Sequence, residues 1–95
     1  MHIYAQTTAA RLRVFAYDTI DLMGDRGRPV RVMVATRSAG RAARLIRRAG
    51  FRVRRWTPPV AQVPSEEAMI AFSDPGAVKW RSHHVGAGQW MSLPH

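Results

Sequence analysis

An alternating valine pattern followed directly by a helical pattern occupies residues 29–50, and this feature constrains the fold more than any other. In Pro29–Thr36 valines alternate with other side chains, which is typical of a β-strand with two distinct faces. Ala39–Ala49 has apolar residues at helical spacing, with Ser38 placed to cap its start and Gly50 to end it. The chain therefore contains a strand that leads into a helix, and the small apolar side chains of that helix favour close packing on a sheet.

The rest of the chain is predicted to add strands and one further helix. Alternation marks Arg11–Ile20 as a strand, residues 21–29 are dense in Gly, Asp and Pro and form a loop, and prolines make residues 57–64 an irregular loop. The other expected elements are a strand at Phe51–Trp56, a helix at Ser65–Phe72 capped by Ser65, a turn at Asp74-Pro75-Gly76, a strand at Ala77–Ser82 and a short terminal strand at Gln89–Leu93. We expect a single α+β domain over residues 1–95, of order β-β-α-β-α-β with or without short terminal strands. Its sheet is mostly antiparallel, and both helices lie on one face.

The length and the absence of cysteine limit the class of protein further. Ninety-five residues suffice for one modest hydrophobic core. Without cysteine, the chain has no disulfide scaffold, thiolate metal site or cysteine nucleophile. No uncharged apolar run is long enough to span a membrane, and the N-terminus lacks the apolar core of a signal peptide. We therefore expect a small soluble domain.

Positive charge is the most unusual property of the composition. Fifteen Lys and Arg residues stand against six Asp and Glu, which gives a formal net charge of +9 and a pI near 11.8. Such a domain attracts polyanions, of which DNA, RNA and anionic membranes are the most general. Every basic residue except Lys79 is arginine, which the codon bias of a GC-rich genome also favours. Codon bias explains arginine in place of lysine, but it does not explain the excess of cations over anions.

The first candidate site is the sheet face that the helices are expected to leave open. Arginines would alternate there with aromatic residues, and this composition suits a platform for single-stranded nucleic acid, because arginine neutralises phosphates and aromatic rings stack on bases. An ordinary solvated face, or a face covered by a terminal segment, is the alternative. The residues expected on this face are Arg11, Arg13, Phe15, Tyr17, Arg31, Met33, Arg52, Arg54 and Trp56, joined from the last strand by either Lys79 and Arg81 or Trp80.

The second candidate site is a line of arginines on one side of the first helix, formed by Arg37, Arg41, Arg44 and Arg48. Such a line could follow a phosphate backbone or enter a major groove. The helix has no Asn or Gln to read bases, so a solvated charged face is the preferred interpretation. The turn at residues 36–41 offers backbone N–H groups that could cradle a phosphate, although an ordinary N-cap is the simpler interpretation.

No combination of side chains predicts an enzyme. The adjacent pair His83-His84 lacks further ligands at metal-binding spacing. The acidic residues are expected to form turns, to balance nearby arginines or to stabilise a helix N-terminus. These residues are Asp18, Asp21, Asp25, Glu66 and Glu67. We therefore expect no catalytic residue, no metal and no cofactor.

The segment DPGAVKW at residues 74–80, followed by GQW at residues 88–90, is the most individual part of the chain. Tryptophans in this position usually attach the last strands to the core, whereas an exposed one would be an interaction anchor. With the strand VRVMVAT and the Ala/Arg helix after it, the DPGxVxWR…GxW pattern resembles a loose group of small accessory proteins of actinobacterial phages and mobile elements. The similarity covers residues 29–92, and the loop at residues 57–64 departs from the pattern. The resemblance implies an accessory protein in a bacterial cytoplasm that acts on host machinery or nucleic acid, and it implies no particular site residues.

The leading hypothesis from the sequence is a non-catalytic protein that binds DNA or RNA. The alternative is a protein-interaction module that binds and modulates or inhibits an acidic host protein, and an unpaired edge strand would permit a homodimer. No membrane partner is expected. The residues expected to bind nucleic acid are Arg11, Arg13, Tyr17, Arg31, Arg37, Arg41, Arg44, Arg48, Arg52, Arg54 and Trp56.

Overall fold

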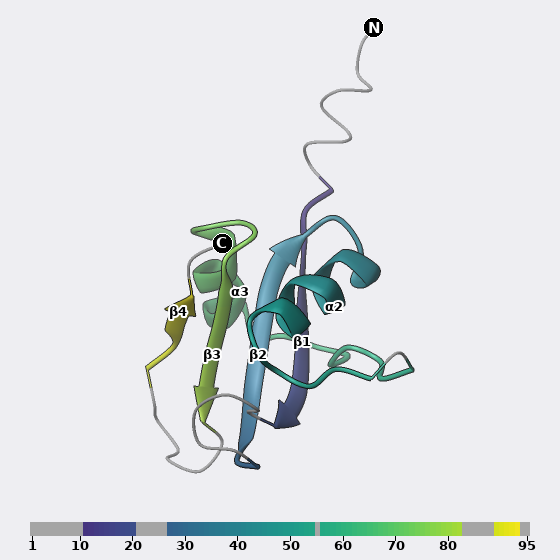
Figure 1. The fold of residues 1–95 in the computed structure, drawn as a ribbon. Coiled ribbons are helices and arrows are strands. Elements are labelled where there is room, and N and C mark those ends of the chain that lie inside the picture. The colour runs from purple at the N-terminus through teal and green to yellow at the C-terminus, as the bar shows by residue number, and fades with distance from the viewer. Residues whose placement is uncertain (1–10, 21–26, 55, 83–88, 94–95) are drawn as a thin grey trace, which may run out of the picture.

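A four-stranded antiparallel sheet with the strand order β1-β2-β3-β4 lies at the centre of the molecule (Figure 1). The computed structural model describes residues 11–20, 27–54, 56–82 and 89–93. The elements are β1 (Arg13–Ile20), β2 (Pro29–Thr36), α2 (Ala39–Arg48), α3 (Ser65–Phe72), β3 (Val78–Ser82) and β4 (Met91–Leu93). The α+β class, the antiparallel sheet and the two helices are confirmed.

The pairing of β1 with β2 is the longest in the sheet, and its register sorts their side chains between two faces. Phe15 pairs with Val34, and Tyr17 pairs with Val32. Directly opposed residues of an antiparallel pair point to the same face. The two aromatic side chains of β1 therefore lie on the same face as the valines of β2.

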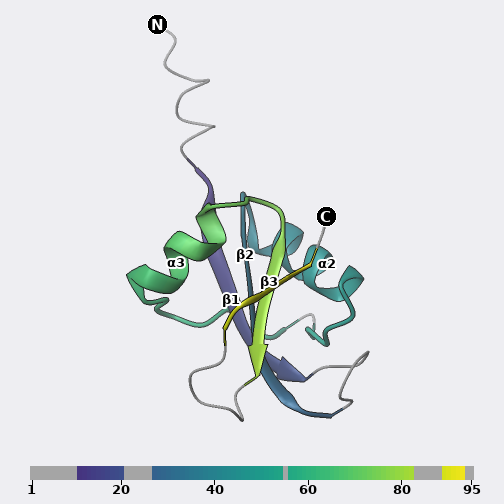
Figure 2. The ribbon, with the colours of Figure 1, turned by 90° about the vertical axis from the view of Figure 1, so that its left-hand side faces the viewer.

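The two helices cover opposite faces of the sheet, which lies between them in Figure 2. α2 packs through Ala42 and Ile46 onto the face that carries the aromatic residues and valines. α3 packs through Ala71 onto the face that carries Met33 and Ala35. The expectation that both helices share one face was therefore wrong. β1 and β2 are apolar on both of their faces, and strands of that composition become buried on both sides.

Local chemistry sets both ends of α2 as predicted. The Ser38 Oγ accepts a hydrogen bond of 3.1 Å from a backbone N–H of the first turn. At the other end Gly50 has a φ of +99°, a conformation that glycine adopts without strain. The Gly50 N–H donates to the Arg47 carbonyl at 3.0 Å. The Phe51 N–H donates to the Ile46 carbonyl at 3.2 Å, which completes a Schellman ending and turns Phe51 into the core.

The chain after α2 follows the outer edge of β1 and does not form the strand predicted at Phe51–Trp56. The Arg52 N–H donates to the Ile20 carbonyl at 3.3 Å, and further along the Val60 N–H donates to the Ala16 carbonyl at 2.7 Å. Prolines lie between these two contacts and have no N–H to donate, so a continuous ladder cannot form.

The segments around α3 differ from the prediction in one detail. The helix begins at Ser65, Pro64 occupies the N-cap position, and no side chain caps it, so the expected capping role of Ser65 was wrong. The turn before β3 is confirmed. The Ala77 N–H donates to the Asp74 carbonyl at 3.1 Å, with Gly76 between them at a φ of +89°.

Candidate nucleic-acid interface

Four arginines lie on the solvent side of α2 and at the turn before it, and we call them the arginine surface. They are Arg37, Arg41, Arg44 and Arg48, and each is exposed. Ala42 and Ile46 are fully buried against the sheet, so the helix presents its opposite side to solvent. α2 contains no acidic residue, and the ion pairs seen among the described residues involve other elements. The arginine surface is therefore an area of concentrated positive charge.

Arg47 belongs to the same helix but faces the segment that follows it. Its Nη1 donates to the Val53 carbonyl at 3.3 Å, which attaches that segment to α2. Burial raises the pKa of Tyr17, and the nearby positive charge of Arg47 lowers it in part. Periodicity could not have identified this role, because it depends on the direction in which the chain leaves α2 after Gly50.

Exposed arginines continue beyond the helix. Phe51 and Val53 are buried, whereas Arg52 and Arg54 point outward and are exposed. Trp56 is 81% exposed. The predicted alternation of inward and outward side chains is therefore confirmed here, although no strand forms. These residues add two cations and one exposed aromatic ring to the chain directly after the arginine surface.

Within the part of the chain that the structure describes, a helix packs on each face of the sheet, so the predicted open platform for bases was wrong. Phe15 is 7% exposed, Tyr17 2% and Met33 0%, because a helix covers each face. Tyr17 has no exposed ring face on which a base could stack. Arg13 is exposed and places its guanidinium carbon 5.2 Å from the centroid of the Phe15 ring. Arg11 is exposed and precedes β1.

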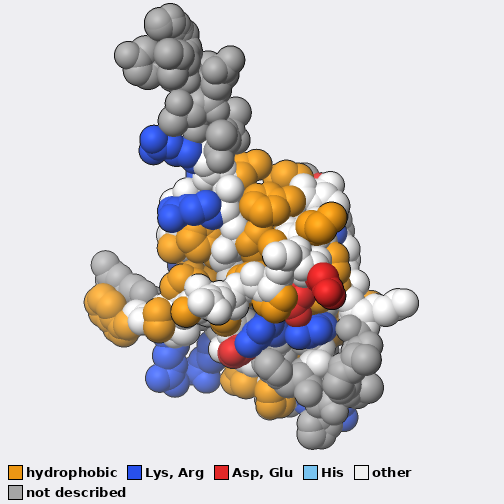
Figure 3. All heavy atoms as spheres, turned by 180° about the vertical axis from the view of Figure 1, so that it is seen from behind, with side chains coloured by type: hydrophobic (Ala, Val, Ile, Leu, Met, Phe, Trp, Pro, Cys, Tyr) orange, Lys and Arg blue, Asp and Glu red, His pale blue; other side chains and the backbone are white. Residues whose placement is uncertain are grey.

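Arg31 belongs to a network of ion pairs on the face covered by α3. Its guanidinium donates to both carboxylate oxygens of Asp18, at 2.8 and 3.0 Å, and these hydrogen bonds raise the pKa of Arg31. Arg31 lies opposite Arg81 of β3. The Nη2 of Arg81 is 2.6 Å from Oε1 of Glu67 on α3. Figure 3 shows acidic and basic side chains next to each other on this face.

Arg81 and Lys79 on this face have further contacts within the chain, whereas one oxygen of Glu67 has no partner among the described residues. Glu67 is 8% exposed, and its Oε2 has no hydrogen-bond partner among the described residues. The Arg81 guanidinium carbon lies 4.9 Å from the centroid of the Trp90 ring. Lys79 is 8% exposed, and its Nζ donates to the Ser92 Oγ at 2.8 Å. Among the described residues, the cations of this face thus have partners within the chain, whereas those of the arginine surface do not.

Two of the tryptophans pack into the domain. The centroid of the Trp80 ring lies 5.9 Å from that of Phe51, on the α2 side. Trp90 packs against the apolar cluster on the α3 side. These contacts attach β3 and β4 to the core, as expected for tryptophans near the end of a small domain. Trp56 is the exposed tryptophan.

The described residues contain no group of three or more His, Cys, Asp or Glu side chains that could hold a metal ion. Other sequence-derived candidates, namely His83, His84, Asp21 and Asp25, lie outside the described residues. Asp18 and Glu67 take part in the ion pairs described above. The chemistry of the described surface is therefore dominated by its arginines.

Comparison with protein-family models, with curated proteins and with solved structures finds no match for this chain. Within the part of the chain that the structure describes, no helix is both long and apolar enough to cross a membrane.

Proposed function

We propose that this protein binds nucleic acid without catalysis, through phosphate contacts made by the arginine surface. The observation that supports this proposal best is the separation of charge between the two helices. α2 has several arginines and no acidic residue, whereas α3 has two acidic residues and no basic one. Arginines held on a helix without acidic neighbours create a local positive potential that attracts a polyanion.

The chemistry and dimensions of α2 suit a phosphate backbone. The planar guanidinium donates two parallel hydrogen bonds to phosphate oxygens. A helix of 10 residues is about 15 Å long, so arginines one turn apart can contact successive phosphates. α2 has no Asn or Gln, the residues that recognise adenine best, which favours contacts with the backbone over base reading. Arg52 and Arg54 would extend the contact, and Trp56 would stack on an unpaired base.

Fluorescence-anisotropy titrations against single-stranded DNA, duplex DNA and RNA test the proposal, at about 50 and 200 mM salt. The variant R44Q/R48Q removes two members of the arginine surface. The control variant R11Q/R28Q removes two exposed arginines elsewhere and has the same net charge. We expect R44Q/R48Q to weaken binding by about tenfold or more, since charged hydrogen bonds to phosphate are lost, and the control to weaken it by less than about threefold.

Two results would contradict this proposal. Equal losses in the two variants would mean that total charge, and not the arginine surface, determines binding. The absence of binding to all three nucleic acids at the lower salt concentration would exclude phosphate contacts altogether.

A triple alanine variant of Arg52, Arg54 and Trp56 measures how far the interface extends beyond α2.

A second candidate is a protein-interaction module for an acidic host protein, and the exposure of Trp56 favours it. Exposed tryptophan and arginine are the side chains most often found at the energetic centre of protein interfaces. A partner that stays bound after nuclease treatment but is lost from Trp56→Ala would favour this candidate. Loss of every partner on nuclease treatment would favour nucleic acid. For either candidate, we propose that the chain is an accessory protein of a bacterial cytoplasm, which is the role that its resemblance to small proteins of actinobacterial phages and mobile elements implies. The formation of a homodimer stays a prediction, which sedimentation measurements test.

A further inference from the structure

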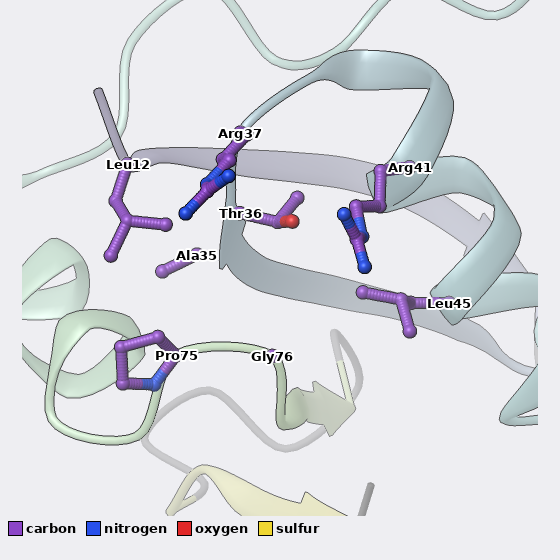
Figure 4. Close-up of a pocket in the computed structure, with 8 residues that line it drawn as sticks. All are labelled: Leu12, Ala35, Thr36, Arg37, Arg41, Leu45, Pro75 and Gly76. Carbon is purple, nitrogen blue, oxygen red and sulfur yellow. The ribbon is translucent and has the colours of Figure 1, made fainter. Parts of the chain in front are cut away.

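A hollow of about 410 Å³ lies at the N-terminal end of α2, between that helix, the end of β2 and the turn before β3 (Figure 4). Its volume falls within the range of pockets that bind small molecules. Leu12, Leu45 and Pro75 supply apolar walls, and Arg37 and Arg41 line its other side. The hollow is therefore apolar in one part and strongly basic in the other.

The wall opposite the helix is held by a backbone contact between distant parts of the chain. The Gly76 N–H donates to the Ala35 carbonyl at 2.9 Å, which joins the turn to the end of β2. Gly76 has a φ of +89°, so a residue with a side chain would be strained here. Because a sheet strand and a capped helix form the other walls, the hollow is a built feature of the fold.

A threonine hydroxyl lies between the two arginines. Thr36 is 5% exposed and lines the hollow. Figure 4 shows the Thr36 side chain between Arg37 and Arg41, with its oxygen on the side of Arg41. The Thr36 hydroxyl is therefore a third hydrogen-bond donor on the lining of the hollow.

The donors of the hollow match a tetrahedral anion. Two guanidinium groups and one hydroxyl can donate hydrogen bonds from different directions, and none of the described residues that line the hollow is acidic. Asp74 belongs to the adjoining turn but is not part of the lining. A phosphomonoester has three acceptor oxygens and about two negative charges, which corresponds to this donor set better than a planar carboxylate does.

We propose that this hollow binds the phosphomonoester group of a nucleotide, with the rest of the nucleotide against Leu12, Leu45 and Pro75. Thr36, Arg37 and Arg41 hold the phosphate. The phosphomonoester can belong to a free mononucleotide or to the phosphorylated 5′ end of a strand. The second source rests on the proposed nucleic-acid binding, and the first does not.

Titration of the intact chain with AMP and with adenosine, followed by NMR or calorimetry, tests the site. We expect one AMP to bind per chain and adenosine not to bind. R37Q/R41Q should weaken AMP binding by about tenfold or more. Thr36→Val, which removes the hydroxyl at almost constant shape, should weaken it by about fivefold. The matched variant R11Q/R28Q, outside both the hollow and the arginine surface, should change it by less than about twofold.

Three outcomes would overturn the site: no AMP binding to the wild-type chain, equal binding of AMP and adenosine, or equal losses in the two double variants. If R37Q/R41Q does not fold, Thr36→Val decides the matter, and an unchanged AMP affinity in that variant overturns the site.

Oligonucleotides that differ only in a 5′ phosphate or 5′ hydroxyl identify the source. A preference for the phosphorylated end that disappears in R37Q/R41Q supports the site and assigns it to strand ends. AMP binding without any oligonucleotide binding supports the site while the proposed function fails. Oligonucleotide binding with neither AMP binding nor an end preference overturns the site and leaves the proposed function intact.

Discussion

The two faces of the sheet carry helices of opposite character. α2 turns its arginines to solvent and buries Ala42 and Ile46. α3 turns apolar side chains outward, with Met69 72% and Phe72 44% exposed, and buries an acidic residue, Glu67. One face of the molecule is therefore strongly cationic and the other is apolar with an internal ion-pair network. The comparison shows that the same residue type, arginine, has different roles in the two layers.

Burial explains the difference between these arginines. Arg31 and Arg81 lie on the sheet beneath α3, where a charge taken from water must have a partner, and each has a carboxylate within hydrogen-bond distance. Arg41 and Arg44 are solvated, so they need no partner within the chain. Arg31 and Arg81 therefore contribute to the stability of the fold, whereas Arg41 and Arg44 are available for binding.

The largest expected effect concerns the apolar residues that distinguish the helices. Ile46 is 0% exposed and Met69 is 72% exposed. Ile46→Ala should lower the free energy of unfolding by about 2–5 kcal/mol, because it leaves a cavity under α2. Met69→Ala should change it by less than about 0.5 kcal/mol. Denaturant unfolding measures both, and equal losses would show that the outer side of α3 is covered in solution.

The second-largest effect on the free energy of unfolding is expected from the buried acidic residue of α3, in comparison with its exposed neighbour. Glu67→Gln removes the charge that faces Arg81 at almost constant volume, and it should cost about 1–3 kcal/mol of unfolding free energy. Glu66→Gln alters an exposed residue and should cost less than about 0.5 kcal/mol. Urea titrations of the two variants provide the measurement. An unchanged free energy of unfolding in Glu67→Gln would mean that the ion pair contributes nothing to stability. The contrast between the two faces would then be lost.

The smallest effect on stability is expected from the substitution of one arginine on each face of the sheet. Arg44 lies between Arg41 and Arg48 at helical spacing, so Arg44→Gln relieves repulsion and should stabilise the chain by about 0.2–0.5 kcal/mol. Arg31→Gln removes the paired hydrogen bonds to Asp18 and should destabilise the chain by about 1 kcal/mol. Thermal unfolding at low salt detects both. Shifts in the same direction would contradict the division of arginines into structural and binding groups.

Much of the fold follows from residues that are neighbours in the sequence. β2, α2 and both ends of α2 were predictable, because alternation, capping by Ser38 and the left-handed Gly50 are local properties. Local rules failed where a distant contact determines the outcome. The segment after α2 has the composition of a strand, yet it forms only isolated hydrogen bonds along β1.

The candidate site was predictable in part. The line of arginines on α2 follows from their spacing alone, and all four are exposed as expected. The prediction of an open sheet face was wrong, because alternation separates two sets of side chains but does not indicate which set faces solvent. Here both sets are apolar enough to be buried, and Tyr17 and Met33 lie in the core on opposite sides of the sheet.

The sequence by itself determined the positive charge, the class of fold and the residues that share the outer side of α2, since composition and periodicity contain that information. The tertiary structure decided which arginines have partners and where a hollow forms. Asp18 meets Arg31, and Glu67 meets Arg81, only because the sheet and α3 bring them together. In the same way, the wall opposite α2 depends on the contact between Gly76 and Ala35. Such contacts join residues far apart in the chain, and no local pattern of side chains specifies them.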